Sequence, residues 1–102
     1  MTKVTMRPGR ICLEGHAGYD SIGKDIVCAG VSTLVYTAIF AMKESNFYDF
    51  MEEKVEPGKV RINYQITAGR EKEAGVQLDM LEKGLLLLSC RYPQNVQLNT
   101  AG

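Results

Sequence analysis

Hydrophobic and polar residues alternate along the first fourteen residues of the chain. Residues 3–7 alternate around Val4 and Met6, and residues 11–14 alternate around Ile11 and Leu13. Between them Pro8 and Gly9 form a dipeptide that favours a turn. An alternation of period two on both sides of a turn predicts a β-hairpin.

The longest apolar pattern follows at residues 26–42, which read IVCAGVSTLVYTAIFAM. Residues that are apolar or small on almost every side predict a helix buried on most of its surface. Asp25 is the natural N-cap, because its carboxylate can accept a hydrogen bond from the N–H of Val27 or Cys28 and suits the positive end of the helix dipole. The polar residues 43–46 are expected to end this helix.

The pattern at residues 47–56 is ambiguous. Phe47, Phe50 and Met51 have a helical spacing, but Glu56-Pro57-Gly58-Lys59 is a turn sequence and residues 60–66 alternate as a strand. We favour a short strand before the turn, paired with the strand after it.

A second helix is predicted by apolar residues that recur on one helix face: Ala74, Leu78, Leu81, Leu85 and Leu88. Gly84 weakens this helix by about 1 kcal/mol relative to alanine, so tertiary packing must stabilise it. Tyr92 and Pro93 end it, and Val96 and Leu98 suggest a short edge strand.

The order β-β-α-β-β-α-β predicts an α+β fold, with one mixed or antiparallel sheet and two helices packed on it. A length of 102 residues suits a single domain over 1–102. Because strands are expected to end near the start of the first helix, this order would bring His16 close to Cys28.

Composition narrows the class of protein. Twelve basic residues balance twelve acidic ones, and this neutrality argues against a direct nucleic-acid partner. The N-terminus has no apolar signal region, and the run 26–42 is short and diluted for a membrane span. We therefore expect a cytoplasmic protein without a membrane partner.

Cysteine and histidine usage adds to this prediction. An odd number of cysteines, three, fits free thiols better than a disulfide framework, and Cys12 and Cys90 suit packing positions. With one histidine and no CxxC or HxxxH spacing, no metal or other cofactor is expected.

Cys28 and His16 are the candidate catalytic residues. A thiol in the first helical turn lies among unsatisfied N–H groups, which favour the thiolate, and a nearby imidazole could take its proton. A cysteine on a buried helix can equally be a small hydrophobe, and a lone histidine beside glycines can be a surface loop residue. Ser32 lies on the same helix face as Cys28, and its hydroxyl could serve the site or bond its own helix backbone.

The sequence Gly15-His16-Ala17, followed by GKDIVCAGVS at residues 23–32, resembles the signature of the ribosomal-processing cysteine protease family, Prp. The family pattern is a GHA, a glycine-containing loop and G-x-D-I-V-C-A-[AG]-x-S, with no departure here. The resemblance implies Cys28 as nucleophile and His16 as general base and acid. The supporting positions of the same pattern are Gly15, Gly23, Asp25 and Ser32.

This resemblance implies an endopeptidase that removes a short N-terminal extension from a large-subunit ribosomal protein, bacterial L-twenty-seven, cutting after an aromatic pair. It also implies a homodimer. The segment 17–24 has the composition of a lid over the thiol or of an ordinary exposed loop. We interpret Asp25 as a helix cap rather than a third catalytic residue. The alternatives are a non-enzymatic module that binds a ribosomal protein or assembly factor, and a redox role for Cys28.

Overall fold

The computed structural model describes residues 1–16, 18, 20–21 and 25–100. Its elements follow the predicted order β-β-α-β-β-α-β, which is confirmed. The seven elements are β1 (Thr2–Arg7), β2 (Arg10–Glu14), α1 (Ile26–Glu44), β3 (Tyr48–Glu56), β4 (Lys59–Ile66), α2 (Glu71–Arg91) and β5 (Val96–Thr100). The ambiguous segment before the Pro57-Gly58 turn is a strand, and its nine residues make it longer than the short strand that the sequence predicts.

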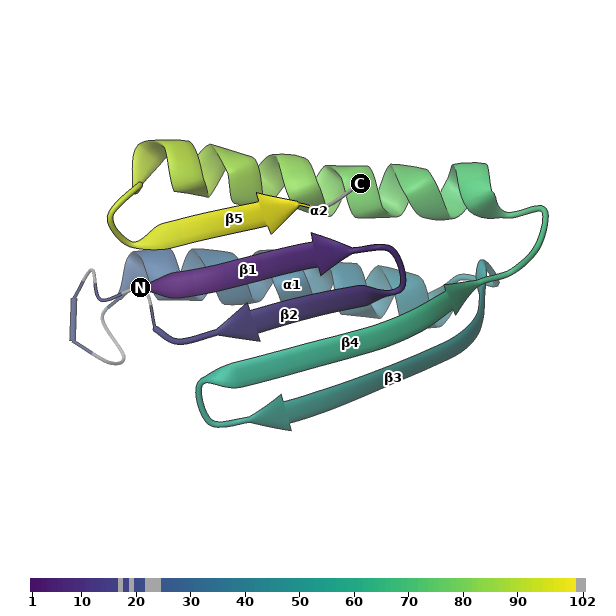
Figure 1. The fold of residues 1–102 in the computed structure, drawn as a ribbon, viewed down its shortest axis with the longest axis horizontal. Coiled ribbons are helices and arrows are strands. Elements are labelled where there is room, and N and C mark those ends of the chain that lie inside the picture. The colour runs from purple at the N-terminus through teal and green to yellow at the C-terminus, as the bar shows by residue number, and fades with distance from the viewer. Residues whose placement is uncertain (17, 19, 22–24, 101–102) are drawn as a thin grey trace.

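The strands form one five-stranded mixed sheet in the order β3-β4-β2-β1-β5. The pairs β1–β2, β2–β4 and β3–β4 are antiparallel, whereas β5 pairs parallel to β1 at one edge. In Figure 1 the strands lie in front of α1, so the helices cover one face of the sheet and leave the other open.

The core lies between the covered face of the sheet and the two helices. Every second strand residue points into it, as Val4, Ile11 and Ile62 do, each at most 1% exposed. From α2 the buried residues are Ala74, Leu81 and Leu85, with Leu78 and Leu88 packed at the core margin. The predicted apolar face of the second helix is therefore the face that packs.

The prediction that α1 is buried on most of its surface is wrong. Only one stripe is buried (Val27, Val31, Val35, Ile39 and Met42), while Ile26 and Phe40 are 63% and 68% exposed. The physical reason is that a two-layer fold covers a helix from the sheet side and from its neighbouring helix alone. By length and composition α1 is long and apolar enough to cross a membrane, contrary to the expectation that the run 26–42 is too short. In this fold its buried stripe contributes to the core.

Gly84 lies where α1 and α2 approach each other. A Cβ added there would lie 2.9 Å from Cδ2 of Leu34 on α1. The glycine thus leaves room for the Leu34 side chain, and this packing explains a residue that weakens the helix locally.

Candidate active site

Asp25 fixes the start of α1 and the position of Cys28. Its backbone is extended, its Oδ1 accepts a 2.9 Å hydrogen bond from the Cys28 N–H, and its carbonyl accepts the Ala29 N–H at 3.1 Å. An aspartate N-cap stabilises a helix by satisfying an orphan donor and complementing the dipole. Cys28 therefore stands in the first turn, half-buried, with its own N–H occupied.

His16 is exposed and lies two residues after the end of β2, where the backbone is bonded to the β3–β4 turn. Gly15, with φ +87°, donates its N–H to the Gly58 carbonyl at 2.8 Å. A Cβ added at Gly58 would lie 3.6 Å from His16 Nε2, so the ring faces the turn between β3 and β4. A side chain at Gly15 would place its Cβ only 2.4 Å from the Met1 carbonyl oxygen, which makes glycine a requirement at this position.

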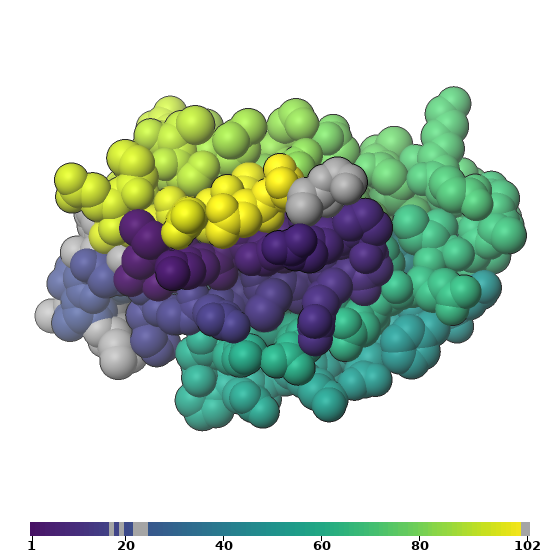
Figure 2. Space-filling view, viewed as in Figure 1, coloured from purple at the N-terminus to yellow at the C-terminus, as the bar shows by residue number. Residues whose placement is uncertain are grey.

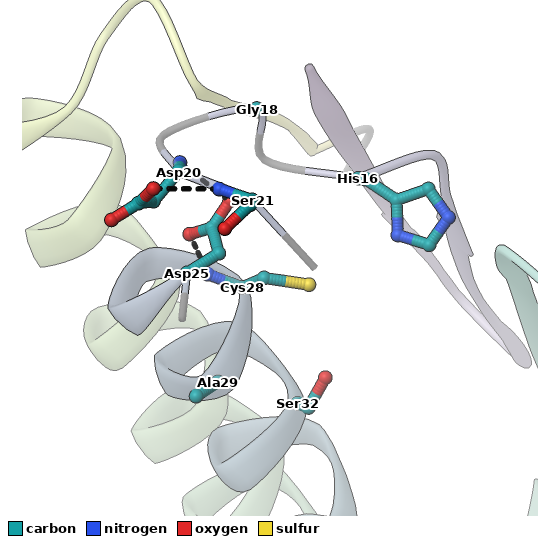
Figure 3. Close-up of a pocket in the computed structure, with 8 residues that line it drawn as sticks. All are labelled: His16, Gly18, Asp20, Ser21, Asp25, Cys28, Ala29 and Ser32. Carbon is teal, nitrogen blue, oxygen red and sulfur yellow. Dashed lines mark hydrogen bonds between the residues drawn. The ribbon is translucent and has the colours of Figure 1, made fainter. Parts of the chain in front are cut away.

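One cavity brings the thiol and the imidazole together. Figure 3 shows the Cys28 sulfur pointing toward the His16 ring from the first turn of α1. The cavity has a volume of about 450 Å³ and is lined by His16, Gly18, Asp20, Ser21, Asp25, Cys28, Ala29 and Ser32. Within the described part of the chain no hydrogen bond joins Sγ to the ring, and catalytic hydrogen bonds often tighten only when substrate binds.

A second cavity of about 170 Å³ adjoins the first and shares His16, Cys28 and Ser32 with it. Its walls are mainly apolar, formed by Leu13, Val31, Tyr36, Val55 and Val60, and its remaining lining residues are Thr2, Gly15, Glu56, Gly58 and Lys59. The Thr2 hydroxyl is buried and has no hydrogen-bond partner among the described residues. Cys28 therefore lies where the two cavities meet.

Ser32 lines both cavities from the turn after Cys28 (Figure 3). The hydroxyls of Thr37 and Ser89 donate to carbonyls of their own helices, whereas the Ser32 hydroxyl has no such bond to a described residue. The sequence leaves two roles open for the Ser32 hydroxyl, a bond to its own helix backbone or a part in the site. Because no backbone bond is formed among the described residues, the hydroxyl is available to a ligand.

Asp20, five residues before the cap, bonds to the cap carboxylate. The Asp20 N–H donates to Asp25 Oδ2 at 3.3 Å, and the Ser21 N–H donates to Asp20 Oδ1 at 2.7 Å. One carboxylate thus orders both the helix start and part of this segment. Gly23 and most of the predicted lid at 17–24 lie outside the described residues.

Comparison with known proteins decides the family. The family model described as "Cysteine protease Prp" matches residues 1–97, nearly the whole chain. The chain belongs to the Prp cysteine protease family. The resemblance stated from the sequence is confirmed.

Solved structures share the Prp fold with this chain. The ribosomal processing protease Prp from S. aureus, in complex with a covalently linked product peptide, is 23% identical with a TM-score of 0.85, over 99% of this chain and 100% of that one. The same protease with a substrate peptide is 21% identical with a TM-score of 0.79, over 99% and 100%. SMU.848 from Streptococcus mutans is 25% identical with a TM-score of 0.71, over 98% and 93%. No curated protein matches the chain.

The sequence did not indicate the distant walls of the second cavity. Thr2, Val55 and Gly58 reach the site from β1, β3 and the β3–β4 turn, far from Cys28 in the chain. The turn at Pro57-Gly58 is predicted from the sequence, but no local signal indicates that it lies beside the histidine. Asp20 and Ser21 belong to the segment 17–24, in which the sequence pattern assigns no separate role to either residue.

Proposed function

We propose that this protein is a cysteine endopeptidase in which Cys28 is the nucleophile and His16 is the general base and acid. The observation that carries this proposal is that both side chains line one cavity at the N-terminus of α1. Membership of a cysteine protease family supports it. Asp25 acts through the helix start, because its carboxylate already accepts the Cys28 N–H and the Asp20 N–H.

The proposed reaction proceeds through an acyl-enzyme. His16 takes the proton of the Cys28 thiol, and the thiolate attacks the scissile carbonyl carbon. When the tetrahedral intermediate collapses, the C–N bond breaks and His16 gives its proton to the leaving amine. Water then attacks the thioester with His16 as base, which releases the new carboxyl group and restores the thiol.

Backbone donors of the first turn would stabilise the oxyanion. The Cys28 N–H already donates to Asp25, and the Ala29 N–H bonds the Asp25 carbonyl. The N–H groups of Ile26 and Val27 remain without an acceptor among the described residues. Removal of one such donor typically costs about 10²-fold or more in rate, so the position of the cap matters for chemistry as well as for stability.

We propose a ribosomal protein precursor of the bacterial L-twenty-seven type as the substrate, cleaved in the cytoplasm. An extended peptide could cross Cys28 with side chains in both cavities, and the apolar walls of the second cavity suit an aromatic side chain. The S. aureus protease was solved with a substrate peptide and with a covalently linked product peptide, and its shared fold supports this choice.

The test is cleavage of a peptide that spans the aromatic-rich N-terminal extension, followed by mass spectrometry. We expect one cut by the wild type and none by Cys28→Ala or His16→Ala. Cys12→Ala is the matched control, because Cys12 lies on β2 and lines neither cavity. If the wild type binds the peptide without cutting it, the protein is a binding module and the proposal fails.

We also propose that the protein is a homodimer. The fold leaves Phe40 of α1 and Met80 of α2 exposed, at 68% and 71%, and Met80 lines an apolar groove of about 210 Å³ between the two helices. Exposed apolar patches of this kind often mark interfaces. Sedimentation analysis would show a dimer for the wild type and a monomer for Phe40→Glu with Met80→Glu. A wild-type monomer at all concentrations would contradict the proposal.

A further inference from the structure

The open face of the sheet lies outside the cavity that His16 and Cys28 share, although Glu56 and Lys59 at one end of this face also line the second cavity. Cross-strand partners share a face, and the neighbours of the buried residues Val4, Ile11 and Ile62 point away from the helices. Figure 2 shows this face toward the viewer, formed by all five strands. Among the described residues, neither helix lies over this open face.

Charge is distributed unevenly between this face and the rest of the molecule. The basic residues on it are Lys3, Arg7, Arg10, Lys54, Lys59 and Arg61, and the acidic ones are Glu14, Glu52 and Glu56. Because the whole chain has twelve of each sign, the remainder has six basic and nine acidic residues. A chain that is neutral overall therefore has a basic sheet face and an acidic remainder.

The acidic residues on this face are largely paired, and several of the basic ones are not. Glu14 pairs with Lys59 at 3.4 Å and Glu52 with Lys54 at 3.8 Å. Lys3, Arg7, Arg10 and Arg61 form no ion pair with any described residue. In addition, Lys54, Lys59 and Arg61 surround a hollow of about 90 Å³ together with Glu56.

We propose that this face binds the phosphate backbone of single-stranded RNA. Three of the four unpaired cations are arginines, whose planar guanidinium groups match phosphate oxygens and stack on bases. The same face presents an exposed aromatic ring, Phe50, for stacking, and the amide side chains Asn63, Gln65, Gln97 and Asn99. These amides can bond 2′-hydroxyls and base edges.

An RNA fits this face better than a membrane or an acidic protein. Phe50 is the one large apolar side chain among the outward-facing residues of the described strands, so the face has little to insert into lipid. An acidic protein would leave the two pairs of amides, one on β4 and one on β5, without a particular partner. The test of this inference is independent of the proposed peptidase activity, because Arg7 and Arg10 flank the β1–β2 turn, at the opposite end of β2 from His16.

The test measures binding of a labelled single-stranded RNA of about 20 nucleotides by fluorescence anisotropy, at about 50 to 200 mM salt. We expect Arg7→Glu with Arg10→Glu to weaken binding at least about tenfold and to reduce the slope of log K against log salt by about 1.4. Lys72→Glu with Lys83→Glu on α2 changes the net charge equally and is expected to alter binding less than about twofold. Peptide cleavage should be unchanged in both variants.

Four results would overturn the inference: no RNA binding by the wild type, an equal loss in both double variants, equal affinity for single-stranded DNA, or tighter binding to phosphatidylserine vesicles than to RNA. If the glutamate variant does not fold by circular dichroism, Arg7→Gln with Arg10→Gln replaces it, and the same reduction of the salt slope is required. If the wild type does not cleave the peptide, only the proposed function is contradicted.

Discussion

The Gly15 N–H donates a 2.8 Å hydrogen bond to the Gly58 carbonyl, which ties the end of β2 to the β3–β4 turn beside the His16 ring. This bond joins two residues 43 positions apart in the chain, and its donor, Gly15, directly precedes the histidine. Placement of the proposed base thus depends on a turn that contributes no catalytic side chain.

Gly15→Ala tests this dependence. Its φ of +87° costs an L-residue about 1–2 kcal/mol, and the added Cβ would meet the Met1 carbonyl oxygen at 2.4 Å. We expect lower stability and a fall in kcat/KM larger than the unfolded fraction explains. Gly9→Ala is the matched control, with φ +83° and only an ordinary 3.4 Å contact at the far turn; it should lose stability and keep kcat/KM per folded molecule. Equal kinetic effects would contradict the positioning role.

Asp25 variants separate capping from catalysis. Asp25→Ala should lower the free energy of unfolding by about 1 kcal/mol, because the Cys28 N–H loses its acceptor. Asp25→Ser keeps a capping oxygen without the charge and should retain near-normal stability and peptide cleavage. Urea denaturation and kcat/KM are the measurements. A loss by the serine variant as large as that of His16→Ala would make Asp25 a catalytic residue instead.

Two glycines of α2 give a paired test of packing. Gly75 has nothing within 4 Å of an added Cβ, so Gly75→Ala should raise stability by up to about 1 kcal/mol through helix propensity. Gly84→Ala should gain less or lose stability, because Leu34 Cδ2 lies 2.9 Å from the new Cβ. In a Leu34→Ala background the two substitutions should become equal in thermal denaturation. A persistent difference would mean that Leu34 is not the cause.

Thr2→Val removes a buried hydroxyl without a partner. The side chain is 2% exposed and its Oγ1 bonds no described residue, so a methyl group of similar size should raise stability by roughly 1 kcal/mol. Thr5→Val, at a half-buried position on the open face, should change stability by less than about 0.5 kcal/mol. Chemical denaturation of both variants is the measurement, and destabilisation by Thr2→Val would show that the hydroxyl is satisfied in solution.

The raised pKa of Tyr48 predicts that the protein becomes less stable at high pH. Burial, and to a lesser extent the nearby Tyr64, raise the pKa of Tyr48 to about 12. The unfolded chain releases this proton near pH 10, so the contribution is fully present below pH 10 and is lost as the pH rises toward 12. Tyr48→Phe should make stability less dependent on pH in this range, although it also loses the bond to Gln77. An unchanged pH dependence in denaturation would refute this assignment.

The sequence by itself determined the elements and the candidate groups. The Asp25 cap, the alternation in the strands and the apolar spacing of α2 depend on neighbours within a few residues, so they were readable without a fold. The same local signature named Cys28 and His16. Such short-range interactions are decided by the backbone conformation and the adjacent side chains.

Only the tertiary structure decided how these parts meet. The parallel pairing of β5 with β1, the hydrogen bond of Gly15 to Gly58 and the one-sided burial of α1 each depend on residues far apart in the chain. The equal numbers of basic and acidic residues likewise gave no sign that charge is separated between the open sheet face and the rest of the molecule. The physical reason is that burial and proximity depend on which surfaces the packed layers cover, and no local pattern specifies that.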